Sequence, residues 1–239
     1  MLAATPPAMI IQTHMLPSHH IPILAETVVE QWIPATMPID TQSIWIDCTF
    51  GGGGHTRQLL QLLQSRQIPH QVIGLDQDET AIARGRQAFA SEIAGGRLQL
   101  LHGHFADLKE HLDGGTAPIT GIFADLGFSS DQMDDPERGL SFRSDGPLDM
   151  RLDPSRGLPL SSRLGQLRES EIADILWNFG EERHSRRIAR QIFDAWRSPR
   201  KPTTPAQLAE IIAHAMPGGK HGAIHPATRS FQALRIWIN

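Results

Sequence analysis

Apolar and polar positions alternate in two rhythms along the first half of the chain. Four short apolar runs predict strands at residues 43–50, 71–76, 97–102 and 119–125. Around them, apolar residues recur every three or four positions, which predicts helices at residues 23–32, 56–64, 79–90 and 106–111. Strands that alternate with helices in this way indicate a parallel, doubly wound α/β sheet.

The pattern changes after the fourth predicted strand. Residues 126–160 are rich in Gly, Asp, Ser and Pro and lack periodicity, so we expect a loop there. Helical spacing returns at residues 170–179, 182–197 and 204–216, with no strand between these segments. Thr204 and Gln207 have the spacing of a capping box at the start of the last one. The pattern therefore predicts a small all-helical domain inserted into the α/β fold.

Four consecutive glycines at residues 51–54 follow the first predicted strand and precede a helix. Because glycine has no Cβ and tolerates positive φ, this loop can turn sharply and present its amide groups to a nucleotide-like ligand. Asp76 ends the second strand about 20 residues later, where dinucleotide-type βαβ units place the acid that binds ribose hydroxyls. The alternatives are a flexible connection at the glycines and a helix cap at Asp76.

The glycine loop differs from two common nucleotide motifs. It is not G-x-G-x-x-G, and no Lys follows the glycines as in a P-loop. Asp47 stands just before the loop, and S-adenosylmethionine enzymes use an acid in this place. The loop therefore favours S-adenosylmethionine as the cofactor. A nicotinamide fits less well, because no candidate acid or base for hydride transfer accompanies the loop.

Asp125 begins a second polar segment, at the end of the fourth predicted strand. The carboxyl ends of parallel strands share one edge, so we expect Asp125 beside the glycine loop. Amino-group methyltransferases place an acceptor here, which holds an N–H of the exocyclic amine so that the nitrogen lone pair can face the methyl carbon. Asp125 is therefore the candidate catalytic residue. Orienting the cofactor, or only opening a turn, are its alternative roles.

Composition indicates an ordinary globular protein, since 40% of the 239 residues are hydrophobic and 20% are charged. The single cysteine, Cys48, suits a reducing cytosol, and we expect neither a signal peptide nor a membrane span of about 18 apolar residues. We therefore predict a cytoplasmic protein. The net charge is −4, but basic residues cluster between Arg183 and Lys201. This cluster is either a solvated helix face or an RNA contact.

Several ordered blocks resemble the bacterial 16S ribosomal RNA (cytosine-N4)-methyltransferase family over nearly the whole chain. They lie at residues 47–55, 74–76, 102–105, 125–132, 138–142, 145–151, 180–183 and 225–236. The resemblance implies a Rossmann-like S-adenosylmethionine methyltransferase sheet with an inserted helical domain. The domains that it implies are a flexible leader at residues 1–18, a methyltransferase domain at 19–140 and 222–239, and an inserted loop and helical substrate-binding domain at 141–221.

The resemblance also implies which residues contact the cofactor. Carried over by position, they are Gly53, Gly54, His55, Asp76, Phe105, Asp125 and Gln132. The glycine amides would approach the methionine part, Asp76 would accept the ribose hydroxyls, and Phe105 would lie against the adenine. Asp125 with Gln132 would fix the reacting end. No metal is implied, because a neutral amine that attacks a sulfonium needs no Lewis acid.

The implied substrate is the N4 amine of a decoding-centre cytosine in 16S rRNA of the small ribosomal subunit, a base that must be unstacked to react. Residues 131–153 would either close over it as a lid or only connect the domains. The candidate RNA contacts are Arg138, Phe142, Arg143, Arg151, Arg186, Arg187 and Arg190. A homodimer is a further prediction.

The chain departs from the family at Asn239, where a helical run stops without a C-cap. The family continues with more helix and the last strands of its sheet, so we expect the fourth strand to lack an outer neighbour. This departure puts the activity of the chain in doubt. The alternatives to an RNA methyltransferase are a non-catalytic RNA- or ribosome-binding remnant and a nicotinamide oxidoreductase.

Overall fold

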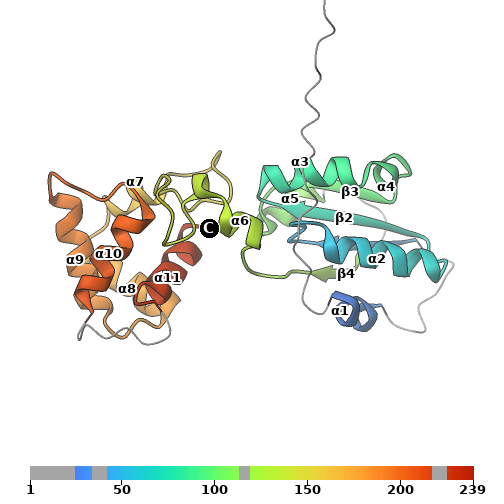
Figure 1. Cartoon of the computed structure of the whole chain (residues 1–239). Helices are drawn as coiled ribbons and strands as arrows, with labels where there is room; N and C mark the ends of the chain where they lie inside the picture. The colour runs from blue at the N-terminus through green and yellow to red at the C-terminus, as the bar shows by residue number, and fades with distance from the viewer. Residues whose placement is uncertain (1–24, 34–41, 113–118, 217–224) are drawn as a thin grey trace, which may run out of the picture.

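The computed structural model describes residues 25–33, 42–112, 119–216 and 225–239. Figure 1 shows two bodies side by side, a sheet with helices packed on it and a group of helices from the later part of the chain. The region around α6 joins the two. The first body is the predicted parallel α/β sheet, and the second is the predicted helical domain.

Four parallel strands form the sheet in the order β3-β2-β1-β4. They are β1 (Ser43–Asp47), β2 (His70–Asp76), β3 (Leu98–His102) and β4 (Ile119–Phe123). The chain runs from β1 through β2 to β3 and then crosses to the other side of β1 to form β4. The four strands were predicted, although β1 and β4 end two or three residues earlier than expected. The reversal of direction lies between β1 and β4, and ligands of open α/β sheets bind at the carboxyl edge beside such a point.

Helices cover both faces of the sheet. They are α1 (Ala25–Trp32), α2 (Gly54–Ser65), α3 (Glu79–Ala88), α4 (Ala90–Ala94), the 3-10 helix η1 (Phe105–Asp107) and α5 (Leu108–His111). Side chains of β1 alternate between the faces: Trp45 packs with Leu59 of α2, while Ile46 lies in the core against which Leu108 of α5 packs. The helix predicted at 79–90 is two helices, because Phe89 leaves the helical conformation at φ −120° and ψ 26°.

Strand β4 forms one edge of the sheet, as the sequence predicted. Among the described residues, no strand pairs with its outer side. Ile119 and Ile122 on this strand are 47% and 53% exposed. The sheet therefore presents an apolar edge next to the segment that carries Asp125.

The helical domain has a hydrophobic core of its own. Its helices are α7 (Leu160–Leu164), α8 (Glu169–Gly180), α9 (Ser185–Arg197), α10 (Pro205–Ala215) and α11 (Thr228–Ile238), reached through α6 (Ser130–Asp134) and the 3-10 helix η2 (Pro136–Arg138). The three predicted helices are present as α8, α9 and α10. Two short helices, α6 and α7, lie in or at the end of the segment predicted as loop. Thr204 caps α10 as predicted, but Gln207 accepts from the N–H of Thr203 rather than that of Thr204.

The predicted return of residues 222–239 to the sheet domain is wrong for α11. This helix packs against α8, and its Phe231, Ala233 and Leu234 are fully buried in the helical core. Leu140 belongs to the same core, so the helical domain also begins slightly earlier than residue 141. The boundary rested on the resemblance, and the apolar spacing of α11 could not correct it, because this spacing shows which face is buried and not which partner covers it.

Candidate active site

A cleft of about 520 Å³ opens at the carboxyl edge of β1, β2 and β4. Loops that leave these strands, and the segment after β3, form its walls, and Leu152 approaches from the helical domain. Six of the seven residues predicted to contact the cofactor line it: Gly54, His55, Asp76, Phe105, Asp125 and Gln132. The other lining residues were not predicted, and contact of these six with a cofactor stays a prediction.

Gly53 is the predicted residue that does not line the cleft. It is buried with φ at +74°, and its N–H donates to the Phe50 carbonyl at 2.7 Å. A Cβ at this position would lie 2.6 Å from Phe89 and 2.8 Å from Phe50. Gly53 thus allows the loop to turn over two phenylalanine rings, whereas Gly51, Gly52 and Gly54 are the glycines that face the cleft.

Asp76 is held rigidly at the end of β2. One carboxylate oxygen accepts the Gly51 N–H at 2.7 Å and the other accepts the Asp78 N–H at 2.9 Å. Burial raises the pKa of Asp76 above its ordinary value, although these two backbone bonds oppose the shift. The glycine loop is therefore fixed to the predicted ribose-binding acid across 25 positions of sequence.

The helix cap considered for Asp76 belongs instead to Asp78, which accepts the Thr80 N–H at 3.0 Å. Asp78 is 1% exposed and also accepts from Gln132 at 2.9 Å and from Arg138 at 2.7 Å. Burial alone would raise the pKa of Asp78, but the bonds from Gln132 and Arg138 outweigh it and leave the pKa below its ordinary value. These hydrogen bonds, which connect the segment after β2 to α6 and η2, were not predicted.

Gln132 owes its place in the cleft wall to a capping box at the start of α6. Its Oε1 accepts the Ser129 N–H at 2.9 Å, the Ser129 hydroxyl accepts the Gln132 N–H, and its Nε2 donates to Asp78. The pair has the S-x-x-Q spacing that marks a helix start. That spacing was the signal in the sequence that could have revealed α6.

Asp47 lies beneath the glycine loop, 1% exposed. Its two oxygens accept from the Thr49 N–H at 3.1 Å and the Thr56 hydroxyl at 2.7 Å. Burial is the main reason that the pKa of Asp47 rises from 3.8 to about 6, and repulsion from Asp76 and Asp125 adds to the rise. The buried Asp47 carboxylate therefore feels the charges of Asp76 and Asp125, the two aspartates that line the cleft.

Asp125 is exposed at the opening of the cleft. Its backbone N–H donates to the Thr49 hydroxyl at 2.7 Å, which joins the end of β4 to the loop after β1. The Asp125 backbone is thus fixed beside the loop after β1, while the residue is exposed and lines the cleft. Thr49 was not among the predicted site residues.

Two aromatic contacts complete the cleft. Phe105 is 39% exposed, and its ring stacks on His104 at 4.4 Å between centroids. His55, at the start of α2, is 8% exposed, and its ring lies 4.7 Å from that of Phe123. Phe105 can therefore offer a free ring face to a flat ligand, whereas His55 forms part of the inner wall.

The candidate RNA contacts between α6 and α7 have different surroundings. Arg138 pairs with Asp78, and Arg151 pairs with both oxygens of Asp149 at 2.6 and 2.8 Å. Arg151 also donates to the carbonyls of residues 154, 156 and 157, and the bond to Asp149 is the main reason that its pKa is raised. Both guanidinium groups therefore have structural partners within the chain, which gives each a role other than the predicted RNA contact.

Phe142 and Arg143 stand at the surface of the helical domain. The Phe142 ring stacks on His225 at 4.5 Å and meets Phe231 edge-on, so one face packs on the domain. Arg143 is exposed and lies over the same ring at 5.7 Å. Arg186, Arg187 and Arg190 are exposed on α9, and no described residue forms an ion pair with them. RNA contact by these residues stays a prediction.

The described residues contain no group of three or more His, Cys, Asp or Glu side chains that could hold a metal ion. No helix in the described ranges is long and apolar enough to cross a bilayer.

Comparison with known proteins matches residues 17–239 to the model of the MraW methylase family. Similar curated proteins carry the name Ribosomal RNA small subunit methyltransferase H. Those of Sorangium cellulosum, Granulibacter bethesdensis and Acinetobacter baumannii are 40%, 44% and 45% identical to this chain. The alignments cover 92%, 95% and 92% of this chain and 66%, 64% and 67% of the relatives. The chain thus spans about two thirds of the length of these relatives.

Proposed function

We propose that this chain, which belongs to the MraW methylase family, transfers a methyl group from S-adenosylmethionine to RNA of the small ribosomal subunit. The observation that carries the proposal is the cleft at the carboxyl edge of the sheet. It brings together a loop without side chains, the fixed carboxylate of Asp76, the exposed ring of Phe105 and the exposed carboxylate of Asp125. The names of the relatives support the choice of RNA.

The cleft residues fit S-adenosylmethionine in size and shape. The volume of about 520 Å³ lies within the range of about 300–1,000 Å³ of small-molecule sites. Each oxygen of Asp76 accepts one backbone N–H and keeps lone-pair capacity for a ribose hydroxyl. Gly51, Gly52 and Gly54 let a ligand approach the backbone, and Phe105 offers a ring face to adenine.

The charges in and below the cleft also favour a cation. Asp76 and Asp125 repel the Asp47 carboxylate, which contributes to the raised pKa of Asp47. A positive charge nearby would relieve this repulsion and favour the ionised carboxylates. When bound, S-adenosylmethionine supplies a methyl group on a positively charged sulfur, so its charge is complementary to this set.

The finer proposal is that the acceptor is the N4 amine of a decoding-centre cytosine in 16S rRNA. Asp125 accepts a hydrogen bond from this amine, which frees the nitrogen lone pair to face the methyl carbon. Because Asp125 is exposed, the proton that the amine loses can pass through its carboxylate to water. The hydrogen bond that the Asp125 backbone N–H donates to the Thr49 hydroxyl keeps Asp125 at one end of the cleft.

The target base has to leave its stack to reach Asp125. Among the predicted contacts of the lid segment, Arg143 has the exposed guanidinium that can meet a phosphate. Arg138 and Arg151 instead hold the wall of the cleft and the adjoining loop in shape. A cytoplasmic location and a homodimer stay predictions.

The proposal is tested by incubating the chain with small ribosomal subunits and methyl-labelled S-adenosylmethionine, and by mapping the labelled nucleotide. We expect label on cytosine N4. Asp125→Ala should lower turnover far more than cofactor affinity, because its bond to the amine strengthens in the transition state. Asp134→Ala, which removes an exposed carboxylate outside the cleft lining, is the matched control.

Cofactor binding is measured separately by calorimetric titration. Asp76→Ala should weaken binding about 10- to 150-fold, since charge-assisted bonds to hydroxyls contribute about 1.5–3 kcal/mol. Binding of S-adenosylmethionine without methyl transfer would favour the RNA-binding remnant. Absence of cofactor binding would refute the proposed function altogether.

A further inference from the structure

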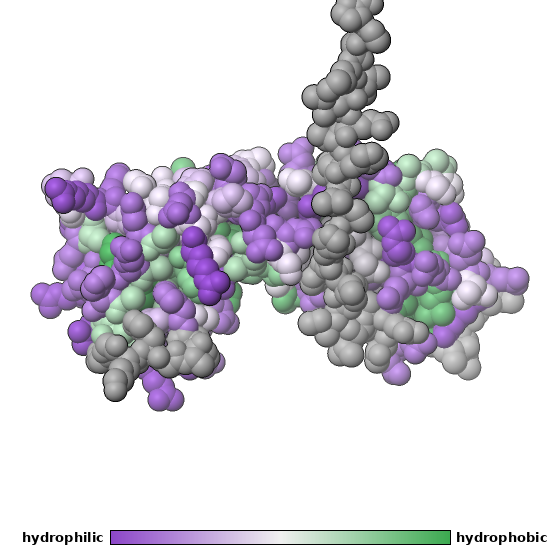
Figure 2. Space-filling model, viewed as in Figure 1, coloured by the Kyte–Doolittle hydropathy of each residue, from purple (hydrophilic) through white to green (hydrophobic). Residues whose placement is uncertain are grey.

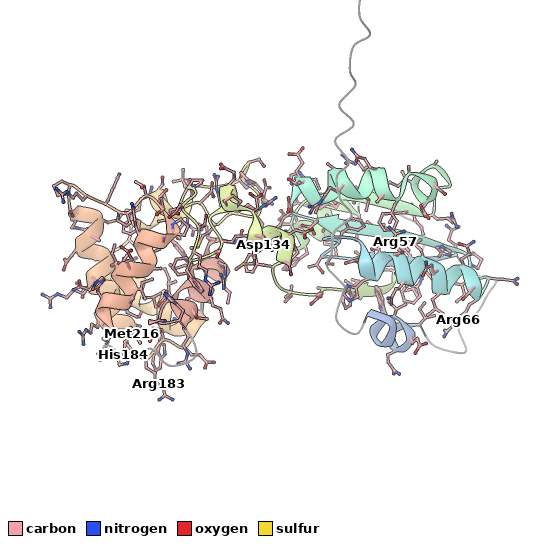
Figure 3. The ribbon with its side chains drawn as sticks, in the orientation of Figure 1. Arg57, Arg66, Asp134, Arg183, His184 and Met216 are labelled. Atoms are coloured by element: carbon pink, nitrogen blue, oxygen red, sulfur yellow. The ribbon has the colours of Figure 1, made fainter. Side chains whose placement is uncertain are left out.

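A second hollow, of about 460 Å³, lies at the junction of α8 and α9. Its walls include Trp177, Arg183, Arg186 and Arg187, with Asp174 as the one carboxylate among the described lining residues. Figure 3 places Arg183 and His184 at the outer end of the helical domain, away from Asp134 and α6. None of the residues that line this hollow lines the cleft.

Trp177 is the most unusual residue of this hollow. It is 57% exposed, although its neighbours Ile175 and Leu176 on α8 lie buried in the helical core. No described residue accepts a hydrogen bond from its indole N–H or stacks on its ring. A large aromatic side chain left uncovered gives up the roughly 2 kcal/mol that burial would contribute to folding. Its position is therefore better explained by a ligand than by the stability of the domain.

The arginines around Trp177 also lack carboxylate partners among the described residues. Arg183, Arg186 and Arg187 are exposed, and no described carboxylate forms an ion pair with them. Arg186 and Arg187 stand in the first turn of α9, where the positive end of the helix dipole disfavours cations. Three guanidinium groups against the single carboxylate of Asp174 leave the hollow positively charged.

Figure 2 shows strongly hydrophilic residues along the outer rim of the helical domain and apolar areas across the middle of the same face. The charged side chains that line the hollow with Trp177 are mainly cationic, which complements a polyanion.

We infer that this hollow binds a single-stranded segment of RNA, with one base stacked on Trp177 and the adjacent phosphates held by Arg183, Arg186 and Arg187. An exposed aromatic ring beside cations is how proteins bind single strands without reading sequence. The inference rests on the proposed function, since the segment belongs to the same RNA substrate. It adds a contact at the far end of the helical domain, which grips RNA at a distance from the reacting base.

The test measures binding of a short fluorescent single-stranded RNA by anisotropy at several salt concentrations, without S-adenosylmethionine. Trp177→Leu should weaken binding about 5- to 150-fold, because stacking of a base contributes about 1–3 kcal/mol. Trp177→Phe should restore most of the affinity, since phenylalanine also stacks. The slope of log affinity against log salt should not change in either variant.

Arginine variants test the phosphate contacts. Changing Arg186 and Arg187 together to alanine should flatten the salt slope by roughly 0.7 for each phosphate that the variant no longer neutralises. Arg86→Ala removes an exposed arginine of the sheet domain and serves as the charge control, and Ile236→Ala removes an exposed apolar side chain of α11. Both controls should bind RNA like the unaltered chain.

Three results would overturn the inference. They are the absence of RNA binding in the unaltered chain, unchanged affinity in Trp177→Leu, and equal affinities of the Leu and Phe variants, which would indicate simple apolar docking. Failure of the proposed function is seen elsewhere, as loss of S-adenosylmethionine binding in calorimetry. The Trp177 variants should bind S-adenosylmethionine normally, so the two failures are distinguishable.

Discussion

Gly53→Ala should destabilise the fold, because Gly53 supports the glycine loop from the side opposite the cleft. A left-handed alanine costs about 1–2 kcal/mol relative to glycine. The new Cβ would also lie 2.6 Å from Phe89 and 2.8 Å from Phe50, and forcing a methyl group into a packed core costs about 1–3 kcal/mol more. We expect a total loss of about 2–5 kcal/mol in the free energy of unfolding.

Gly51→Ala is the matched control. Gly51 also has positive φ, at +51°, but the nearest atom to its Cβ would be the Thr49 carbonyl oxygen at 3.8 Å, an ordinary contact. This variant should therefore carry only the conformational cost of about 1–2 kcal/mol. For a urea slope of about 2 kcal/mol per molar, the clash at Gly53 should separate the two unfolding midpoints by roughly 0.5–1.5 M.

Urea unfolding of both variants, followed by circular dichroism, measures this separation, and calorimetry then gives their affinity for S-adenosylmethionine. Equal midpoints would refute the steric argument, because the rings would then have moved aside at no cost. A Gly53→Ala protein that is as stable as the unaltered chain but no longer binds cofactor would instead support the contact predicted from the sequence.

Five further substitutions, in three comparisons, test the charged groups. The raised pKa of Asp47 means that, between about pH 4 and 6, the folded state keeps a proton that the unfolded chain loses. The free energy of unfolding should therefore fall as pH rises through this range. Asp47→Asn should remove this fall and raise the free energy of unfolding by up to about 3 kcal/mol at pH 7. A pH-independent difference between the two proteins would contradict this reasoning. Asp78→Ala should cost about 3–5 kcal/mol in urea unfolding because it removes a buried carboxylate that accepts from Thr80, Gln132 and Arg138. Asp135→Ala, which removes a 41% exposed partner of the same guanidinium, should cost at most about 1 kcal/mol. Similar losses of stability in both variants would contradict a larger contribution from Asp78 than from Asp135. Arg151→Ala should lower the melting temperature, because it removes the pair with Asp149. Arg143→Ala should weaken RNA binding and leave the melting temperature unchanged. The reverse result would indicate that Arg151 contacts RNA.

The sheet and its ligand edge could be predicted because their signals are local. Alternating apolar runs marked all four strands, and the glycines and Asp76 marked the edge where the cleft lies. The ends of elements were harder. Phe89 interrupts a helix through its own backbone angles, while the five residues of α6 are too few to show a period.

The contacts that shape the cleft could not be predicted, because they join residues that are far apart in sequence. Asp78 bonds to Gln132 and Arg138, which lie 54 and 60 positions away. Nothing local to Gly53 indicates that Phe89 will lie against it. Arg138 was expected at an RNA phosphate because arginine in a polar loop has that chemistry, but its partner Asp78 became apparent only in the fold. The partner of Arg151, Asp149, lies only two positions away, yet the sequence alone did not show that the two side chains would pair.

The hydrogen bonds at Asp78 have a consequence for the order in which the protein folds during synthesis. During synthesis the strands of the sheet leave the ribosome first, and domains generally fold as units in that order. At that stage Asp78 has only its cap on Thr80, and the wall of the cleft is missing. Gln132 of α6 and Arg138 of η2 emerge later and form their hydrogen bonds to Asp78. A nascent chain can therefore hold a folded sheet before it holds a cleft, and the wall of the cleft forms only once these two side chains have emerged.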